Sequence, residues 1–329
     1  MKKALITTVP FAKRNRLSLK LIEDAGIEYI INPHNRKPNE KQLIELVDRC
    51  DYIIAGTEKI SNRVMQKAAN LKLISRVGVG LDGVDLIAAK KNNINVSYTP
   101  DAPTPAVVEL TIGLMFSLLR SIHVANLQLH RDEWERIFGK RIFDVKIGII
   151  GVGRIGTGVL RTLGAIGVKT IYVNDLKPKE NFNEALNLIW ENKEQIYKEA
   201  DIISLHLPLT NLTKNMIQRG ELLSMKKKAM IINTSRGGIV NEDDLYDVMK
   251  EGHLSGVALD VYEEEPYAGK LKEIDRCLLT AHMGSMTTDC RSRMEIEAVE
   301  EVVRHATGQP LKNLVPQFEY DMQAEKFNH

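Results

Sequence analysis

The feature that most constrains the fold of this chain is a glycine-rich turn between a short apolar run and an amphipathic segment. Residues 147–150 (IGII) lead directly into residues 151–156 (GVGRIG). Hydrophobic residues then recur with a helical period, and a second β-branched run, residues 170–173, is followed by Asp175. This order of strand, glycine turn, helix, strand and acid predicts a βαβ unit that binds a dinucleotide.

Each glycine of the turn has its own role in this interpretation. Gly151 allows the chain to turn sharply off the strand, and Gly153 lets the backbone approach a pyrophosphate. Gly156 lets the following helix pack close to the strand. The first N–H groups of the helix would then point at the phosphates, which the helix dipole also favours.

The acid after the second strand indicates which dinucleotide is bound. Asp175 is expected to accept hydrogen bonds from the adenosine ribose, and its charge would repel a 2′-phosphate. We therefore expect NAD (NADH) as the cofactor, with NADP less favoured. Lys177 and Lys179 act against this preference, because they could reach a 2′-phosphate.

Length, charge and cysteine usage restrict the class of protein further. A chain of 329 residues predicts about two domains. A net charge of +2 gives no reason to expect a nucleic-acid or membrane partner, and no 18-residue apolar run predicts a transmembrane helix. The N-terminal apolar run is short and broken by Pro10, unlike a signal peptide. Three scattered cysteines predict reduced thiols, no metal site and a cytoplasmic protein.

The first hundred residues alternate strand and helix signals, which predicts a parallel sheet covered on both faces. The expected strands are residues 4–8, 28–31, 52–56, 71–77 and 95–98, and helical periods cover residues 42–49 and 62–69. No phosphate-type turn follows the first strand, so we expect this part to bind the substrate. The glycine-containing loop of residues 76–85 fits either an anion-binding nest or a structural turn.

Three prolines within residues 98–105 predict a crossing between domains. One long helix is expected from residue 106 to about residue 130, apolar on several faces and buried, in part against a second subunit. A helix over residues 288–307 is expected to return to the first domain. The expected domains are therefore residues 1–103 with 286–329 for the substrate, and residues 104–285 for the dinucleotide.

Three residues past neighbouring strands of the second domain suggest chemistry. Arg236, Glu265 and His282 follow expected strands at residues 229–233, 254–260 and 278–281. A guanidinium suits a carboxylate, histidine carries protons near neutral pH, and a glutamate can hold one imidazole nitrogen. Individually they could be a surface arginine, a solvated acidic loop and an ordinary loop histidine. Their shared place at the ligand-binding edge of the sheet favours a catalytic site.

These segments resemble those of the D-isomer-specific 2-hydroxyacid dehydrogenases, most closely the short phosphoglycerate dehydrogenase-like branch without C-terminal regulatory domains. The resemblance covers nearly the whole chain in six ordered motifs. They are residues 76–85, 107–111, 151–156, 233–237, 258–266 and 280–284. It implies an α/β fold with a Rossmann NAD-binding domain, a flavodoxin-like α/β substrate domain and a cleft between them. It also implies a homodimer built on the helix that begins near residue 106.

The resemblance further implies interconversion of a D-2-hydroxy acid and its 2-keto acid by hydride transfer with the nicotinamide. Arg236, Glu265 and His282 would be catalytic, with His282 as proton donor or acceptor. The implied substrate-binding residues are Arg76, Val79, Gly80, Arg236 and His282. The implied cofactor-binding residues are Gly151, Gly153, Arg154, Ile155, Gly156, Asp175, His206, Leu207, Pro208, Thr234, Ser235, Arg236, Asp260, His282 and Gly284.

Some positions depart from the family pattern and leave the substrate open. Residues 56–59 lack the arginine that phosphate-bearing substrates often meet, so a 3-phosphoglycerate-like or a glyoxylate- or hydroxypyruvate-like acid remains possible as substrate. Asp101, Pro103, Met283 and Met286 also differ from the frequent residues. Two other functions stay open: a phosphite-type dehydrogenase, and an NAD-sensing interaction protein like the dehydrogenase-like corepressors. Glu265 argues against formate, whose enzymes usually have glutamine there.

Overall fold

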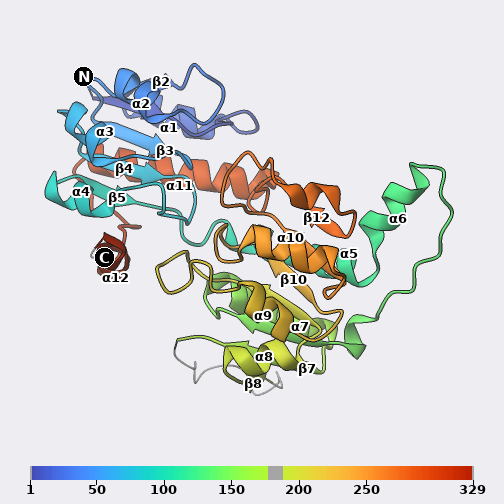
Figure 1. The fold of residues 1–329 in the computed structure, drawn as a ribbon. Coiled ribbons are helices and arrows are strands. Elements are labelled where there is room, and N and C mark those ends of the chain that lie inside the picture. Colours follow the sequence, from blue (N-terminus) through green and yellow to red (C-terminus); the bar gives the residue numbers. More distant parts are fainter. Residues whose placement is uncertain (1, 177–187, 328–329) are drawn as a thin grey trace. The chain divides into compact units, whose positions relative to one another are not determined.

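The structure is a computed structural model, and it describes residues 2–176 and 188–327. Contacts divide the chain into two compact units (Figure 1). Unit 1 comprises Met1–Pro103 with Ser285–His329, and unit 2 comprises Thr104–Gly284. Lys177 and Lys179, which bear on the choice between NAD and NADP, lie outside the described residues. The cleft expected between two domains stays a prediction.

Unit 1 is built on a five-stranded parallel sheet with the order β2-β1-β3-β4-β5. This is the flavodoxin-like order, as expected from the resemblance. The strands are β1 (Lys3–Ile6), β2 (Glu28–Ile31), β3 (Tyr52–Ala55), β4 (Leu73–Arg76) and β5 (Asn95–Ser97). Its helices are α1 (Leu17–Asp24), α2 (Glu40–Leu46), α3 (Asn62–Lys67), α4 (Leu86–Lys91), α11 (Thr288–Ala306) and α12 (Gln317–Phe327).

The C-terminal part of unit 1 completes its core. Helix α11 packs against α1 and β4, where the Ser75 hydroxyl donates a 2.7 Å hydrogen bond to the carbonyl of Ala298. Beyond α11 the chain runs beside β5, and Val315 N–H donates to the Val96 carbonyl at 2.9 Å. The sequence predicted α11 but not α12, because α12 lacks a strong amphipathic pattern.

Unit 2 is built on a seven-stranded parallel sheet with the order β12-β11-β10-β9-β6-β7-β8. The sheet reverses direction of growth between β6 and β9, as in a Rossmann domain. The strands are β6 (Lys146–Ile150), β7 (Thr170–Asn174), β8 (Leu188–Trp190), β9 (Ile202–Leu205), β10 (Met230–Asn233), β11 (Gly256–Leu259) and β12 (Cys277–Leu279). Its helices are α5 (Thr104–Leu119), α6 (Ile122–Leu129), α7 (Arg154–Ile166), α8 (Lys193–Glu199), α9 (Arg219–Ser224) and α10 (Glu242–Lys250), with 3₁₀ turns at Ile142–Asp144 and Lys270–Glu273.

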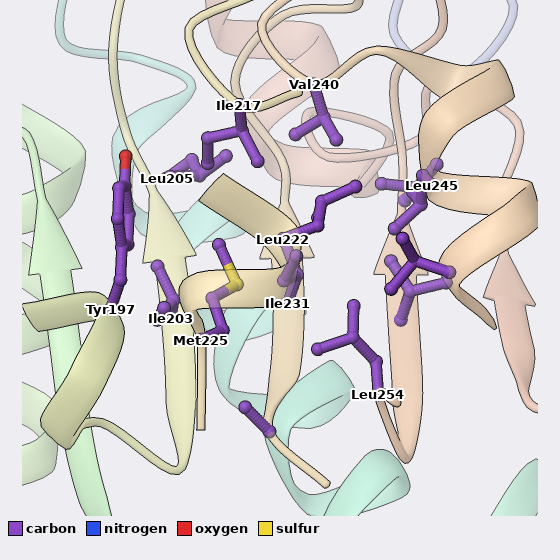
Figure 2. Close-up of a cluster of buried hydrophobic side chains, with 14 of the residues drawn as sticks. Tyr197, Ile203, Leu205, Ile217, Leu222, Met225, Ile231, Val240, Leu245 and Leu254 are labelled. Carbon is purple, nitrogen blue, oxygen red and sulfur yellow. The ribbon is translucent and has the colours of Figure 1, made fainter. Parts of the chain in front are cut away.

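One face of this sheet is covered by α8, α9 and α10. Their side chains meet those of β9 and β10 in a cluster that includes Tyr197, Ile203, Leu222, Ile231 and Leu245 (Figure 2). Strands β9 and β10 are buried along their whole length and are mostly apolar, as expected for strands covered on both faces. This core fixes the strand ends that carry the polar residues described below.

The single helix predicted from residue 106 to about 130 is wrong. Helix α5 ends at Leu119, and α6 begins at Ile122 after a bend of 64°. Ser121 has a left-handed conformation (φ 50°), and the Leu119 carbonyl accepts a 2.9 Å hydrogen bond from Lys140 N–H. The returning chain thus takes an acceptor that a continuing helix would need.

Within the described residues, no single helix is both long and apolar enough to cross a membrane. The bent pair α5 and α6 is long and apolar enough together, by length and composition only.

Candidate active site

The glycine turn joins β6 to α7, and close packing explains two of its three glycines. Gly151 has φ 96°, and a Cβ there would lie 2.3 Å from the carbonyl oxygen of His206. A Cβ on Gly156 would lie 2.0 Å from the carbonyl oxygen of Gly151. By contrast, a Cβ on Gly153 would meet nothing within 4 Å. The turn is therefore packed against backbone at Gly151 and Gly156 and is open at Gly153. An open side next to the first N–H groups of α7 fits a bound pyrophosphate.

Asp175 lies directly beside this turn, after the end of β7. Its Oδ2 accepts a 2.6 Å hydrogen bond from Val152 N–H, and its Oδ1 accepts one of 2.6 Å from Leu176 N–H. These bonds fix the carboxylate next to the glycine turn. That position suits the ribose contact expected from the sequence.

The segment after β9 closes the other side of the turn. His206 Nε2 lies 2.9 Å from the Ser204 hydroxyl, and burial lowers the pKa of His206 to about 4. Its ring is therefore neutral near pH 7, and its backbone packs on Gly151. Leu207 is half-buried and Pro208 is exposed, so both can contact a ligand.

The loop after β10 is shaped by Asn233. The Asn233 side chain accepts from Ser235 N–H (3.0 Å) and from the Ser235 hydroxyl (2.7 Å), and it donates to the Arg236 carbonyl (2.7 Å). Both hydrogen-bond donors of Ser235 are therefore engaged within the loop. Arg236 is half-buried, and its Nη1 donates to the Ser235 carbonyl at 2.6 Å. The loop holds Arg236 at the edge of the sheet.

Thr111 on α5 is a contact of this loop that sequence reasoning missed. Its hydroxyl donates to the Val107 carbonyl (2.8 Å) and lies 2.9 Å from the Thr234 hydroxyl. A hydroxyl has one proton, so Thr234 must be the donor in the second bond. Thr234 can then offer a ligand only an acceptor. The sequence signal was a threonine within a mostly apolar helix.

The expected acid–histidine pair is formed. His282 Nδ1 lies 2.9 Å from Oε2 and 3.0 Å from Oε1 of Glu265. The side chains are 41% and 29% exposed, respectively, so the pair is reachable from solvent. Because Glu265 occupies Nδ1, Nε2 is the ring nitrogen that can serve a substrate. The geometry therefore suits an imidazole that donates or accepts a proton at Nε2.

Asp260 fixes the backbone next to this histidine. It is 1% exposed, and its carboxylate accepts from the Thr280 hydroxyl (2.6 Å), Met283 N–H (2.8 Å) and Gly284 N–H (2.8 Å). His282 itself has a left-handed backbone conformation, with φ 48°. These three bonds hold the turn that contains it. A buried carboxylate with several donors is well satisfied without a cation.

The Arg236 loop and the Glu265 loop are packed together through Gly237. Tyr262 lies at the base of the Glu265 loop, and its buried hydroxyl shares its one proton between the carbonyls of Leu259 (3.0 Å) and Thr280 (2.9 Å). Gly237 lies against the Tyr262 backbone. Because β10, β11 and β12 are neighbours, the three predicted catalytic residues come from one edge of the sheet. The sequence did not indicate the part of Tyr262 in this arrangement.

Unit 1 carries the predicted substrate loop at the end of β4. Arg76 is buried, and its Nη1 donates to the Val77 carbonyl of its own loop. Gly78 has φ 135°, and its N–H donates to the Thr99 hydroxyl at 2.7 Å. Val79 and Gly80 are half-buried, and within the described residues of unit 1 their N–H groups have no acceptor. This geometry supports an anion-binding nest over a purely structural turn.

The fold and this site define an oxidoreductase that uses a dinucleotide. A sequence model of the D-isomer specific 2-hydroxyacid dehydrogenase NAD-binding domain matches residues 112–284. The chain belongs to the D-isomer specific 2-hydroxyacid dehydrogenase family. It is accordingly an NAD-dependent oxidoreductase with the family's nucleotide-binding domain in unit 2.

Curated relatives and solved structures agree with this assignment. The hydroxypyruvate reductase of Thermotoga maritima is 34% identical over 270 residues, which cover 80% of this chain and 87% of that protein. The D-3-phosphoglycerate dehydrogenase of Methanocaldococcus jannaschii is 34% identical over 303 residues, and this chain spans 57% of its length. The TT0316 protein from Thermus thermophilus superposes with a TM-score of 0.86 at 30% identity, covering 95% of this chain and all of that one. A D-lactate dehydrogenase from Aquifex aeolicus, in complex with NAD and lactic acid, superposes with a TM-score of 0.83 at 25% identity. The match covers 95% of this chain and 99% of that one.

Proposed function

We propose that this NAD-dependent dehydrogenase interconverts a short, unphosphorylated 2-keto acid, of the glyoxylate or hydroxypyruvate type, and the D-2-hydroxy acid. The observation that carries the proposal is the Glu265–His282 pair beside the Arg236 loop, at the carboxyl edge of the nucleotide-binding sheet. Relatives named hydroxypyruvate reductase and glyoxylate reductase support this substrate class.

Three side chains divide the work in the reduction. When bound, NADH supplies a hydride to the keto carbon. Arg236 binds the substrate carboxylate through its planar guanidinium. His282 donates the Nε2 proton to the keto oxygen, which becomes the hydroxyl, and Glu265 stabilises the imidazolium before that transfer. In the oxidation His282 takes the same proton back.

The remaining contacts with the cofactor are proposed from unit 2. Gly151, Gly153, Arg154, Ile155 and Gly156 form the open turn that would hold the pyrophosphate. Asp175 would accept from the ribose, and the segment 206–208 would contact the adenosine. Thr234, Asp260 and Gly284 would hold the nicotinamide side. One lone pair of the Asp260 carboxylate is left for the carboxamide after its three internal bonds.

A buried acid in unit 1 supports the choice of an unphosphorylated substrate. Glu58 is 2% exposed and accepts from Gly56 N–H and from the Thr7 hydroxyl. No cation pairs with Glu58 in the described part of the chain. Its loop runs beside residues 78–85, where Ile60 N–H donates to the Gly83 carbonyl at 2.7 Å. We call residues 78–85 the carboxylate loop, because we propose that the N–H groups of Val79 and Gly80 also bind the substrate carboxylate. A fixed negative charge there disfavours a second anionic group on the substrate.

We also propose a cytoplasmic homodimer. The segment from α6 to residue 141 presents apolar side chains that unit 2 leaves uncovered; they include Ile122 (55% exposed), Leu129 (57%), Trp134 (81%) and Phe138 (102%). Several large apolar side chains exposed along one segment are typical of a protein interface. Three buried free thiols fit a reducing compartment. A Trp134→Glu variant that still sediments as a dimer would contradict this interface.

The test is NADH oxidation with a panel of 2-keto acids, for the wild type, His282→Ala and the surface control His34→Ala. We expect turnover with glyoxylate or hydroxypyruvate. The His282→Ala variant should lose about 10²–10⁴-fold in kcat while NADH binding persists. Tight NADH binding without turnover of any acid would instead support an NAD-sensing interaction protein. Turnover of phosphite would support the phosphite-type enzyme.

A further inference from the structure

The C-terminal segment of unit 1 reaches back to the strand edge that carries the proposed carboxylate loop. After pairing beside β5, the chain forms α12, which packs against α4. Tyr320 of α12 joins the apolar core of unit 1, so the helix is anchored by burial. The next turn of α12 presents Gln323 toward the start of α4.

The side-chain amide of Gln323 forms hydrogen bonds to the backbone there with both its oxygen and its nitrogen. We call this pair of hydrogen bonds the Gln323 clasp. Its Oε1 accepts a 2.6 Å hydrogen bond from Leu86 N–H, and its Nε2 donates a 2.9 Å bond to the Val84 carbonyl. Leu86 N–H is one of the unpaired donors at a helix start. One side chain therefore satisfies a donor and an acceptor two residues apart, and it can do so in a single orientation only.

The clasped residues form the end of the loop that begins at Gly78. Val84 N–H donates to the Leu81 carbonyl (3.0 Å), and the Asp85 carboxylate caps α4 at Ala88 N–H (2.8 Å). These local hydrogen bonds restrain the backbone conformation of the end of the loop. We expect a displacement of residues 84–86 to shift Val79 and Gly80, whose N–H groups have no acceptor within the described part of unit 1.

We propose that Gln323 is a positioning residue that sets the carboxylate loop of unit 1 for substrate binding. The proposal rests on the proposed function, in which Val79 and Gly80 bind the substrate carboxylate. Gln323 touches neither the substrate nor the cofactor in this account. Its loss should weaken substrate binding and leave kcat and NADH affinity unchanged, because the residues for those steps belong to unit 2.

The test compares Gln323→Ala and Gln323→Glu with Gln317→Ala, a control on the same helix whose amide contacts Lys90 and Asp321. Both Gln323 variants should raise KM for the accepted 2-keto acid about three- to tenfold, with kcat within about twofold. The Gln323→Glu variant keeps the acceptor for Leu86 but faces the Val84 carbonyl without a donor. A role in helix packing alone would spare that variant and would overturn the proposal.

Hydrogen exchange provides a readout that does not need turnover. Amides of residues 78–86 should exchange faster in Gln323→Ala than in Gln317→Ala or the wild type. Unchanged exchange would overturn the proposal even if the enzyme is active. Faster exchange with an unchanged KM would overturn the link from this clasp to substrate binding. If the wild type turns over no acid, the proposed function fails, and faster exchange would still support the clasp.

Discussion

Gly237 lies so close to Tyr262 that a Cβ on Gly237 would stand 1.9 Å from the Tyr262 carbonyl carbon. This contact joins the loop of Arg236 to the loop of Glu265. The Cβ of a Gly237→Ala variant would clash with backbone atoms, so the two loops must move apart at a cost in free energy. We expect kcat/KM to fall at least about tenfold, with destabilisation of about 1–3 kcal/mol. The matched control is Gly220→Ala in α9, where a Cβ meets nothing within 4 Å; an equal loss in both would refute the explanation.

The charge on Glu265 should matter beyond its hydrogen bond to His282. Glu265→Gln keeps an acceptor for the imidazole but removes the charge that stabilises its protonated form. A charge-assisted hydrogen bond contributes about 1.5–3 kcal/mol, so kcat should fall about 10- to 150-fold. Steady-state kinetics beside Glu264→Gln, an exposed neighbour, would measure this. Full activity in Glu265→Gln would show that orientation alone suffices.

Asp175 should set the preference for NADH over NADPH. Asp175→Asn keeps a side-chain oxygen for Val152 N–H and removes the charge that would face a 2′-phosphate. We expect the ratio of kcat/KM for NADH to that for NADPH to fall at least about tenfold, or about 1.4 kcal/mol. An unchanged ratio would place the discrimination elsewhere.

His206 should make the protein less stable as the pH falls. Burial lowers the pKa of His206 from its ordinary value of 6.5 to about 4. Between these values the unfolded chain binds a proton that the folded chain excludes, so stability decreases as pH falls from 6.5 to 4. The loss is at most about 3 kcal/mol. Denaturant midpoints of wild type and His206→Gln across this range would test it; parallel curves would contradict it, and His34→Gln should follow the wild type.

The sequence predicted most of the framework because its signals are local. Periodic apolar runs predicted the strands of unit 1 and the strands of unit 2 except β8, and the turn at Gly151 identified the first strand of unit 2. The strand ends then brought Glu265 and His282 to one edge, as the contact between them confirms. Parallel strands deliver their carboxyl ends together, so motifs far apart in sequence can be placed without coordinates.

What the sequence could not predict depends on contacts between distant backbone groups. The break before α6 arises because Lys140 reaches the Leu119 carbonyl, which no helical periodicity reveals. The hydrogen bond from Gly284 N–H to the Asp260 carboxylate and the bond from Gln323 to the Val84 carbonyl likewise join residues 20 or more positions apart. Such bonds follow from the fold and not from local composition.

Unit 1 is assembled from both ends of the described chain, whereas unit 2 is continuous. During synthesis, the ribosome therefore releases all of unit 2 before the residues of α11 emerge. The sheet of unit 1 cannot complete its packing until that helix is synthesised, because α11 covers Ser75 and one face of β4. Since domains fold as units, we expect unit 2 to mature first and unit 1 to be the aggregation-prone nascent species.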